Sequence, residues 1–335
     1  MRFKNIFFAA AAAMALTACS SDDEQSFVSQ FPEDGVMRFT TNLVDPAAAL
    51  TRASITGNDL NQQGEKFQVK VVNNASATYS YFSNVQYNGS EWVPAPRMLW
   101  QNNTQAITVT AAYKQGKDFT DNEFVGGANL TVAADQSSQA NLNAQDLLTM
   151  PTKTISNPST ETTLLQGGKL VINFYHALSK LDVTLELKDE FFLNSLNTAN
   201  ISDVKISGTN LGYNFQPMTT ANENYGTVTA AATPVAADIL ANQCAFTAAT
   251  DADMHSHATY EAIVVPQTIA AGQLTVSFKI GTRSFSWTNI EAITLEQGKH
   301  YTLPLTVGYD TTTLNARAFS VSSWEDQPGD NLGTE

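Results

Sequence analysis

Charged residues, cysteine and histidine are scarce in this sequence. Charged residues make up 15% of the 335 residues, compared with about 25% in an ordinary soluble domain, and the chain has two cysteines and four histidines. The formal net charge is −14 and no cluster of Lys and Arg interrupts it, which argues against binding to nucleic acid or to anionic membranes. Hydrophobic residues nevertheless make up 43% of the chain, too many for a disordered protein, so we expect buried cores.

Motifs for catalysis or metal binding are also missing. The sequence has no Gly-x-Ser-x-Gly elbow, His-Glu-x-x-His motif, Cys-x-x-Cys pair or phosphate-binding glycine loop. Residues 251–257 place His255 and His257 on one face of an extended strand near two aspartates, but a polar loop explains them without further ligands. We therefore expect no enzyme, no metal and no cofactor, and a structural role for His176 and His300.

The N-terminus has the pattern of a bacterial lipoprotein signal peptide. Two basic residues precede an apolar run at residues 6–16, which is too short for the ~20 residues that span a bilayer, and residues 16–19 match a lipobox. We expect residues 1–18 to be removed and Cys19 to carry the lipid that anchors the protein in the cell outer membrane. The acidic run at residues 20–24 fits a solvated tether and also resembles the export signals of surface lipoproteins, which favours the cell surface over the periplasm.

Beyond residue 52, apolar and polar residues alternate with a period of two. This alternation predicts half-buried antiparallel strands, since successive side chains of a strand point to opposite faces. The clearest segments are residues 66–71, 107–113, 181–188 and 274–287. No comparable stretch shows helical spacing over three turns, and many short strands with frequent turn residues are typical of β-sandwiches. We therefore predict an all-β fold.

A turn-rich stretch at residues 152–168 divides the patterned part of the chain. It is rich in Ser and Thr and is bracketed by an Asn-Pro and a Gly-Gly pair, as expected of a connection between domains. The predicted organisation is a leader at residues 19–52, an N-terminal antiparallel β-sandwich at residues 53–165, a C-terminal one at residues 168–325, and a polar tail at residues 326–335.

Several short motifs occur in a fixed order along the chain. They are the lipobox, Thr51-Arg52-Ala53, the aromatic segment at residues 87–92 with Trp100, and residues 174–181, 263–267, 295–301 and Trp324. By their number and order, more than by any one of them, they resemble the motifs of the Bacteroidetes fimbrillins, the subunits of type V pili. The resemblance extends over nearly the whole chain.

The resemblance implies two tandem transthyretin-like β-sandwich domains that polymerise by donor-strand exchange. It also implies that an arginine-specific protease cuts the leader between Arg52 and Ala53, with Arg38 as the second choice, after which an N-terminal strand leaves. The alternating segment at residues 36–43 fits that strand and offers apolar side chains to a core. Its departure would leave unpaired strand edges for a neighbouring subunit's strand to fill.

The expected function is therefore that of a structural or tip subunit of surface fimbriae that supports adhesion. Its partners would be other fimbrial subunits, the protease and, before cleavage, the outer membrane, with no nucleic acid. Residues 325–335 lack apolar anchors, so either the strand-like segment at residues 316–324 is the donor or the subunit accepts a strand without donating one. The alternative is a monomeric, lipid-anchored module that binds a glycan or host ligand on exposed Trp92 and Trp100.

Overall fold

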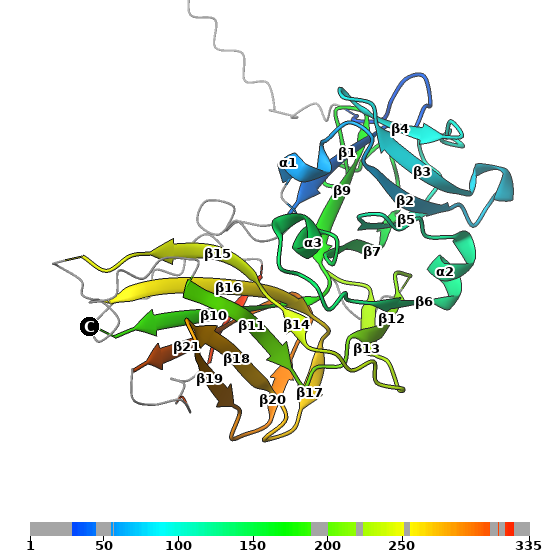
Figure 1. Cartoon of the computed structure of the whole chain (residues 1–335). Helices are drawn as coiled ribbons and strands as arrows, with labels where there is room; N and C mark the ends of the chain where they lie inside the picture. Colours follow the sequence, from blue (N-terminus) through cyan, green and yellow to red (C-terminus); the bar gives the residue numbers. More distant parts are fainter. Residues whose placement is uncertain are drawn as a thin grey trace, which may run out of the picture.

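The computed structural model describes residues 29–44, 55, 57–188, 200–218, 224–250, 255–308, 314 and 319–324. The regular secondary structure of these residues consists mostly of β-strands in several sheets, which confirms the predicted all-β class (Figure 1). The division into two transthyretin-like domains stays a prediction. In the described ranges, no helix has the length and apolar character needed to cross a membrane.

The first half of the chain forms an eight-stranded sheet in the order β1-β4-β3-β2-β5-β7-β9-β8. Its strands are β1 Phe39–Leu43, β2 Lys66–Val72, β3 Tyr81–Tyr87, β4 Trp92–Ala95, β5 Ile107–Lys114, β7 Leu147–Ile155, β8 Leu165–Gln166 and β9 Lys169–His176. An additional parallel pairing joins β1 to β9, so the sheet closes on itself (Figure 1). The closed sheet surrounds the smaller of two hydrophobic cores, into which the alternating residues Phe67, Val69 and Val71 of β2 point as predicted.

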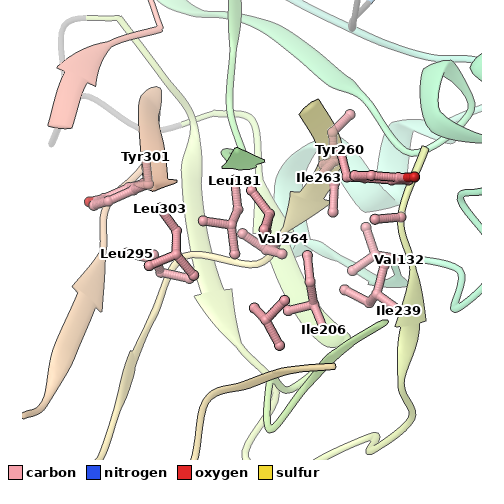
Figure 2. Close-up of a cluster of buried hydrophobic side chains, with 14 of the residues drawn as sticks. Val132, Leu181, Ile206, Ile239, Tyr260, Ile263, Val264, Leu295, Tyr301 and Leu303 are labelled. Atoms are coloured by element: carbon pink, nitrogen blue, oxygen red, sulfur yellow. The ribbon is translucent and has the colours of Figure 1, made fainter. Parts of the chain in front are cut away.

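Two sheets of the second half enclose the larger core. The five-stranded sheet has the order β15-β16-β10-β21-β22, with β10 Ser179–Leu187, β15 Asn242–Thr247, β16 Ser256–Val264, β21 Lys299–Val307 and β22 Ser320–Ser323. The four-stranded sheet has the order β14-β11-β18-β19, with β11 Ile201–Ser207, β14 Ile239–Leu240, β18 Thr275–Ile280 and β19 Arg283–Thr288. Leu181 and Leu303 from the first of these sheets and Ile206 from the second meet in this core (Figure 2). The predicted hairpin at Gly281 is the β18–β19 turn.

Short elements complete the fold, and one small sheet joins the two halves. β6 Ala128–Thr131 pairs with β12 Gly212–Gln216, which pairs in turn with β13 Thr227–Ala230, and β17 Gln267–Ile269 pairs with β20 Ile293–Leu295. The helices are α1 Gly57–Leu60, α2 Asp121–Gly126, α3 Gln139–Asn143 and the 3-10 turn η1 Ala77–Tyr79. Phe124 of α2 and Leu142 of α3 belong to the larger core, so the first half supplies part of the packing of the second.

The strand pairings show that the chain passes from the first sheet to the sheets of the second half after β9. The predicted division at residues 165–168 falls before β9, yet this strand pairs with β1, β7 and β8 of the first sheet. The Gly167-Gly168 pair is the turn of the β8–β9 hairpin, and both glycines have positive φ. The chain leaves the first sheet at Ala177 and Leu178, just before β10.

The larger core predicts that a substitution at a buried position lowers the free energy of unfolding far more than one at an exposed position. Leu303→Ala should lower the free energy of unfolding by about 2–5 kcal/mol, because it leaves a cavity at a fully buried position of β21. Ile290→Ala, at a position 91% exposed, should change it by less than about 0.5 kcal/mol. Urea unfolding of both variants measures the difference, and equal effects would contradict this assignment of the core.

Candidate functional site

The candidate site is the place in the first sheet that β1 occupies, which we call the β1 seat. β1 lies parallel to β9, with Phe39 opposite Leu170 and Leu43 opposite Phe174. On its other side it is antiparallel to β4 through the pair of Phe39 with Trp92. The segment just before β1 continues this edge, because Val36 bridges Leu99. β1 is therefore the strand that joins β4 to β9 and closes the sheet.

Main-chain hydrogen bonds hold the segment on both sides. On the β4 side, the Met37 N–H donates to the Met98 carbonyl at 3.0 Å. On the β9 side, the Leu170 N–H donates to the Arg38 carbonyl at 2.7 Å, and beyond β1 the Val44 N–H donates to a β9 carbonyl at 2.9 Å. Withdrawal of the segment would leave the Met98 carbonyl, in the loop after β4, and the Leu170 N–H and Phe174 carbonyl of β9 without these partners.

Two side chains of this segment fill the smaller core, as the alternation predicted. Met37 is 1% exposed and Phe39 is 2% exposed. The Phe39 ring lies edge-on to Phe67 with the ring centroids 6.1 Å apart, and Phe67 also contacts Trp92 at 4.9 Å and Phe174 at 5.5 Å. Burial of the two side chains contributes about 1.5–3 kcal/mol each. Removal of the segment would therefore open an apolar groove lined by aromatic rings.

Arg38, the second-choice cleavage site, lies inside this hydrogen-bonded segment. Its guanidinium donates to both carboxylate oxygens of Asp34, at 3.0 and 2.5 Å. This bond, together with one from the Val36 N–H, holds the pKa of Asp34 well below its usual range, and it raises the pKa of Arg38. The peptide bond after Arg38 links this residue to the buried Phe39. The Arg38 carbonyl accepts the hydrogen bond from the Leu170 N–H of β9, so this peptide bond lies within the sheet.

Arg52, Ala53 and Cys19 lie outside the described residues. Before Arg52 in the sequence, the last described residue is Val44. After it, the first described residue is Ile55, which is 1% exposed in the smaller core. The Ile55 N–H donates to Oδ2 of Asp146 at 3.3 Å. The described residues on either side of the predicted cut, Val44 and Ile55, are thus bonded to β9 and to a buried carboxylate.

Both tryptophans proposed as stacking platforms are buried. Trp92 and Trp100 are each 5% exposed. The Trp92 indole N–H donates to Asn61 at 3.2 Å, and the Trp100 ring is covered edge-on by Phe31 of the leader, with the centroids 5.6 Å apart. Neither ring is available to bind a glycan, so the alternative of a surface binding module loses the feature that suggested it.

The histidines take part in pairwise contacts. His255 Nδ1 lies 2.8 Å from Glu186, and His300 Nε2 lies 2.8 Å from Asp182. Residues 251–254, which the metal hypothesis also required, lie outside the described ranges, and within those ranges no group of three or more His, Cys, Asp and Glu could hold a metal ion. Cys244 is half-buried, and burial raises the pKa of its thiol.

Near the C-terminus, β22 is an edge strand that pairs with β21. Its apolar residue Val321 is 55% exposed, whereas the next residue after the strand, Trp324, is 5% exposed. The Trp324 ring stacks flat on His176, with centroids 4.3 Å apart and an interplanar angle of 4°. Sequence reasoning named both residues as parts of motifs but had no signal that they touch, because 148 positions of chain separate them.

The described chain thus combines a closed β-sheet, completed by β1, with a second body of β-sheets. Two solved structures share the fold. A proposed cell adhesion protein from Bacteroides uniformis has a TM-score of 0.54 at 17% identity and covers 88% of this chain and 99% of its own. One from Bacteroides ovatus has a TM-score of 0.53 at 13% identity and covers 87% and 98%. A search of curated protein sequences finds no match.

The family model described as Fimbrillin-like matches residues 51–324. The chain therefore belongs to the fimbrillin-like family, as its motifs indicated, and its role is that of a fimbrial subunit or adhesin at the cell surface.

The β1 seat predicts which leader residues hold the strand in place. Phe39→Ala should lower the free energy of unfolding by about 3–5 kcal/mol, because it leaves a gap beside Phe67 and Trp92. Asn42→Ala, which removes only an exposed side-chain hydrogen bond to Asn173 at 3.1 Å, should lower it by about 1 kcal/mol or less. Urea unfolding of the uncut protein measures both, and a Phe39→Ala effect as small as the control's would argue against the seat.

Proposed function

We propose that the protein is a structural or tip subunit of surface fimbriae that is exported as a lipoprotein, matured by arginine-specific cleavage and assembled by donor-strand exchange. The subunit supports adhesion and carries out no enzymatic reaction. The single observation that carries the proposal is that β1, which belongs to the leader, closes the first sheet. Its removal leaves two adjacent strand edges and an open apolar groove, which is the geometry that accepts an added strand.

The structure favours Arg52 over Arg38 as the cleavage site. A protease must bind several residues of extended chain around the scissile bond, and the bond after Arg38 is part of the sheet next to the buried Phe39. A cut after Arg38 would also leave β1 itself attached to the mature chain. A cut between Arg52 and Ala53 separates the whole of β1 from the rest.

The segment that ends at Trp324 is the best candidate for a donor strand. Phe319 and Val321 are two apolar residues at the same spacing as Met37 and Phe39. β22 is held on one edge by β21, and its side chains are exposed or half-buried. A subunit at the tip of the fibre would accept a strand in its own groove but would not donate one, so its β22 would stay paired with β21.

The lipid on Cys19 would hold the precursor at the outer membrane until the cut releases it into the fimbrium. Cys19→Ser should abolish the incorporation of radiolabelled palmitate into the protein, because the thiol that takes the lipid is gone. Cys244→Ser is the matched control and should be labelled normally. Labelling of the Cys19→Ser protein would contradict the lipoprotein assignment.

Cleavage and assembly can be followed with the purified lipid-free protein and an arginine-specific protease. Cleavage should expose Trp92 and Trp100, shift the tryptophan emission to longer wavelength, and yield SDS-resistant oligomers, because Phe31 of the leader packs on the Trp100 ring and Phe39 is the strand partner of Trp92. Arg52→Ala should remain uncut and monomeric, while the control Arg38→Ala should behave as the wild type. Cleavage of the wild type that causes neither the shift nor oligomers would refute assembly by strand exchange.

A further inference from the structure

β1 is the main hydrogen-bonding partner of the middle of β9. In the described part of the chain, β8 pairs with the first two residues of β9, Lys169 and Leu170, and β7 pairs with the last two, Tyr175 and His176. The residues between them pair with β1. Loss of β1 therefore leaves β9 held mainly at its two ends, and one of those ends is His176.

His176 is fixed on one side by a buried carboxylate. Both His176 and Asp146 are fully buried, and the His176 Nδ1 lies 3.0 Å from Oδ1 and 2.9 Å from Oδ2 of Asp146. Oδ2 also accepts the hydrogen bond from the Ile55 N–H at 3.3 Å. Ile55 follows the proposed cut by three residues, so cleavage would place a free chain end next to this bond. The two local consequences of maturation, loss of β1 and a new chain end, thus meet at the Asp146–His176 pair.

On its other side, His176 holds the C-terminal strand. The Trp324 ring lies flat against the His176 ring, and the Trp324 N–H donates to the Gly298 carbonyl at 2.8 Å. Gly298 is itself bonded through its N–H to the carbonyl of Leu178, two residues after His176. The side chains of β22 are exposed or half-buried, so Trp324 is the buried anchor at the end of this strand.

We propose that Asp146 and His176 are positioning residues that couple the β1 seat to the C-terminal strand, so that loss of β1 also releases β22 and Trp324. This inference rests on the proposed function, since it assumes that the leader is cut and leaves. It adds that opening of the acceptor groove and release of the donor segment are one linked event in each subunit. An uncut subunit then keeps both its groove and its donor strand closed.

Hydrogen exchange of the purified protein, uncut and cut with an arginine-specific protease, tests the coupling. Cutting should speed the exchange of amides in β4 and β9 and, in the same sample, raise the exchange of residues 320–324 by about tenfold or more. Fast exchange of β4 and β9 with unchanged protection of β22 would overturn the inference and leave the proposed function standing. No change at β4 and β9 would refute the proposed function, and the inference with it.

The variant His176→Phe separates positioning from general stability. It keeps a flat ring against Trp324 but cannot bond to Asp146, so the difference in β22 exchange between the cut and uncut forms should shrink to less than about twofold. Val321→Ala, at an exposed position of β22, should keep the full wild-type difference. A full wild-type difference in His176→Phe would overturn the role of the pair.

Asp146→Leu serves as a second variant should His176→Phe fail to fold. The leucine side chain offers no hydrogen-bond acceptor, so it cannot bond to either Ile55 or His176. The difference in β22 exchange should again fall, although the side chain has almost the same shape. An unchanged difference in this variant would count against the coupling in the same way.

Discussion

Closure of the first sheet by β1 is the interaction on which the rest of the architecture depends. A sheet without this strand has two free edges, at β4 and β9, and a core that lacks Met37 and Phe39. Exposed edges next to an apolar surface are a hazard that natural β-proteins cover or pair. Here the cover is a segment from the leader, joined to the rest of the chain through residues 45–54. Under the proposed function, a stable precursor and an assembly-competent subunit would differ by one strand.

The larger core contains no residue of β1, so it limits the damage that loss of β1 would cause. It receives Phe124 and Leu142 from the first half and is closed by the sheets of the second half, with β6 paired to β12 across the two. None of its members belongs to the leader. Withdrawal of β1 would thus damage the smaller core directly and, by the coupling proposed above, reach the larger core at Trp324, while β10, β16 and β21 keep their mutual packing. Under the proposed maturation, the smaller core would be opened and refilled, and the larger core would keep the chain folded.

Local patterns predicted the strands well but could not assign all of them to sheets. Period-two alternation identified β2, β5, β10 and β18, and it placed Met37 and Phe39 in a core, because burial of one face of a strand leaves its trace in every second residue. The apolar sequence of β9 does not indicate which strands pair with it. The Gly167-Gly168 pair is equally compatible with a linker between domains and with the hairpin turn that the structure has there. The Asp146–His176–Trp324 contacts join three distant parts of the chain, and no local rule predicts such a meeting.

The direction of β1 has a consequence for the shape of an assembly. β1 runs parallel to β9 and antiparallel to β4. A strand in the β1 seat therefore lies between two neighbouring strands that run in opposite directions. If a strand of a second copy occupies this seat, the donor and acceptor surfaces are different parts of the molecule, which makes the contact heterologous. Repetition of a heterologous contact without closure gives an open helical polymer with distinguishable ends. A fibre of this kind has an inherent polarity, and growth at one end differs chemically from growth at the other.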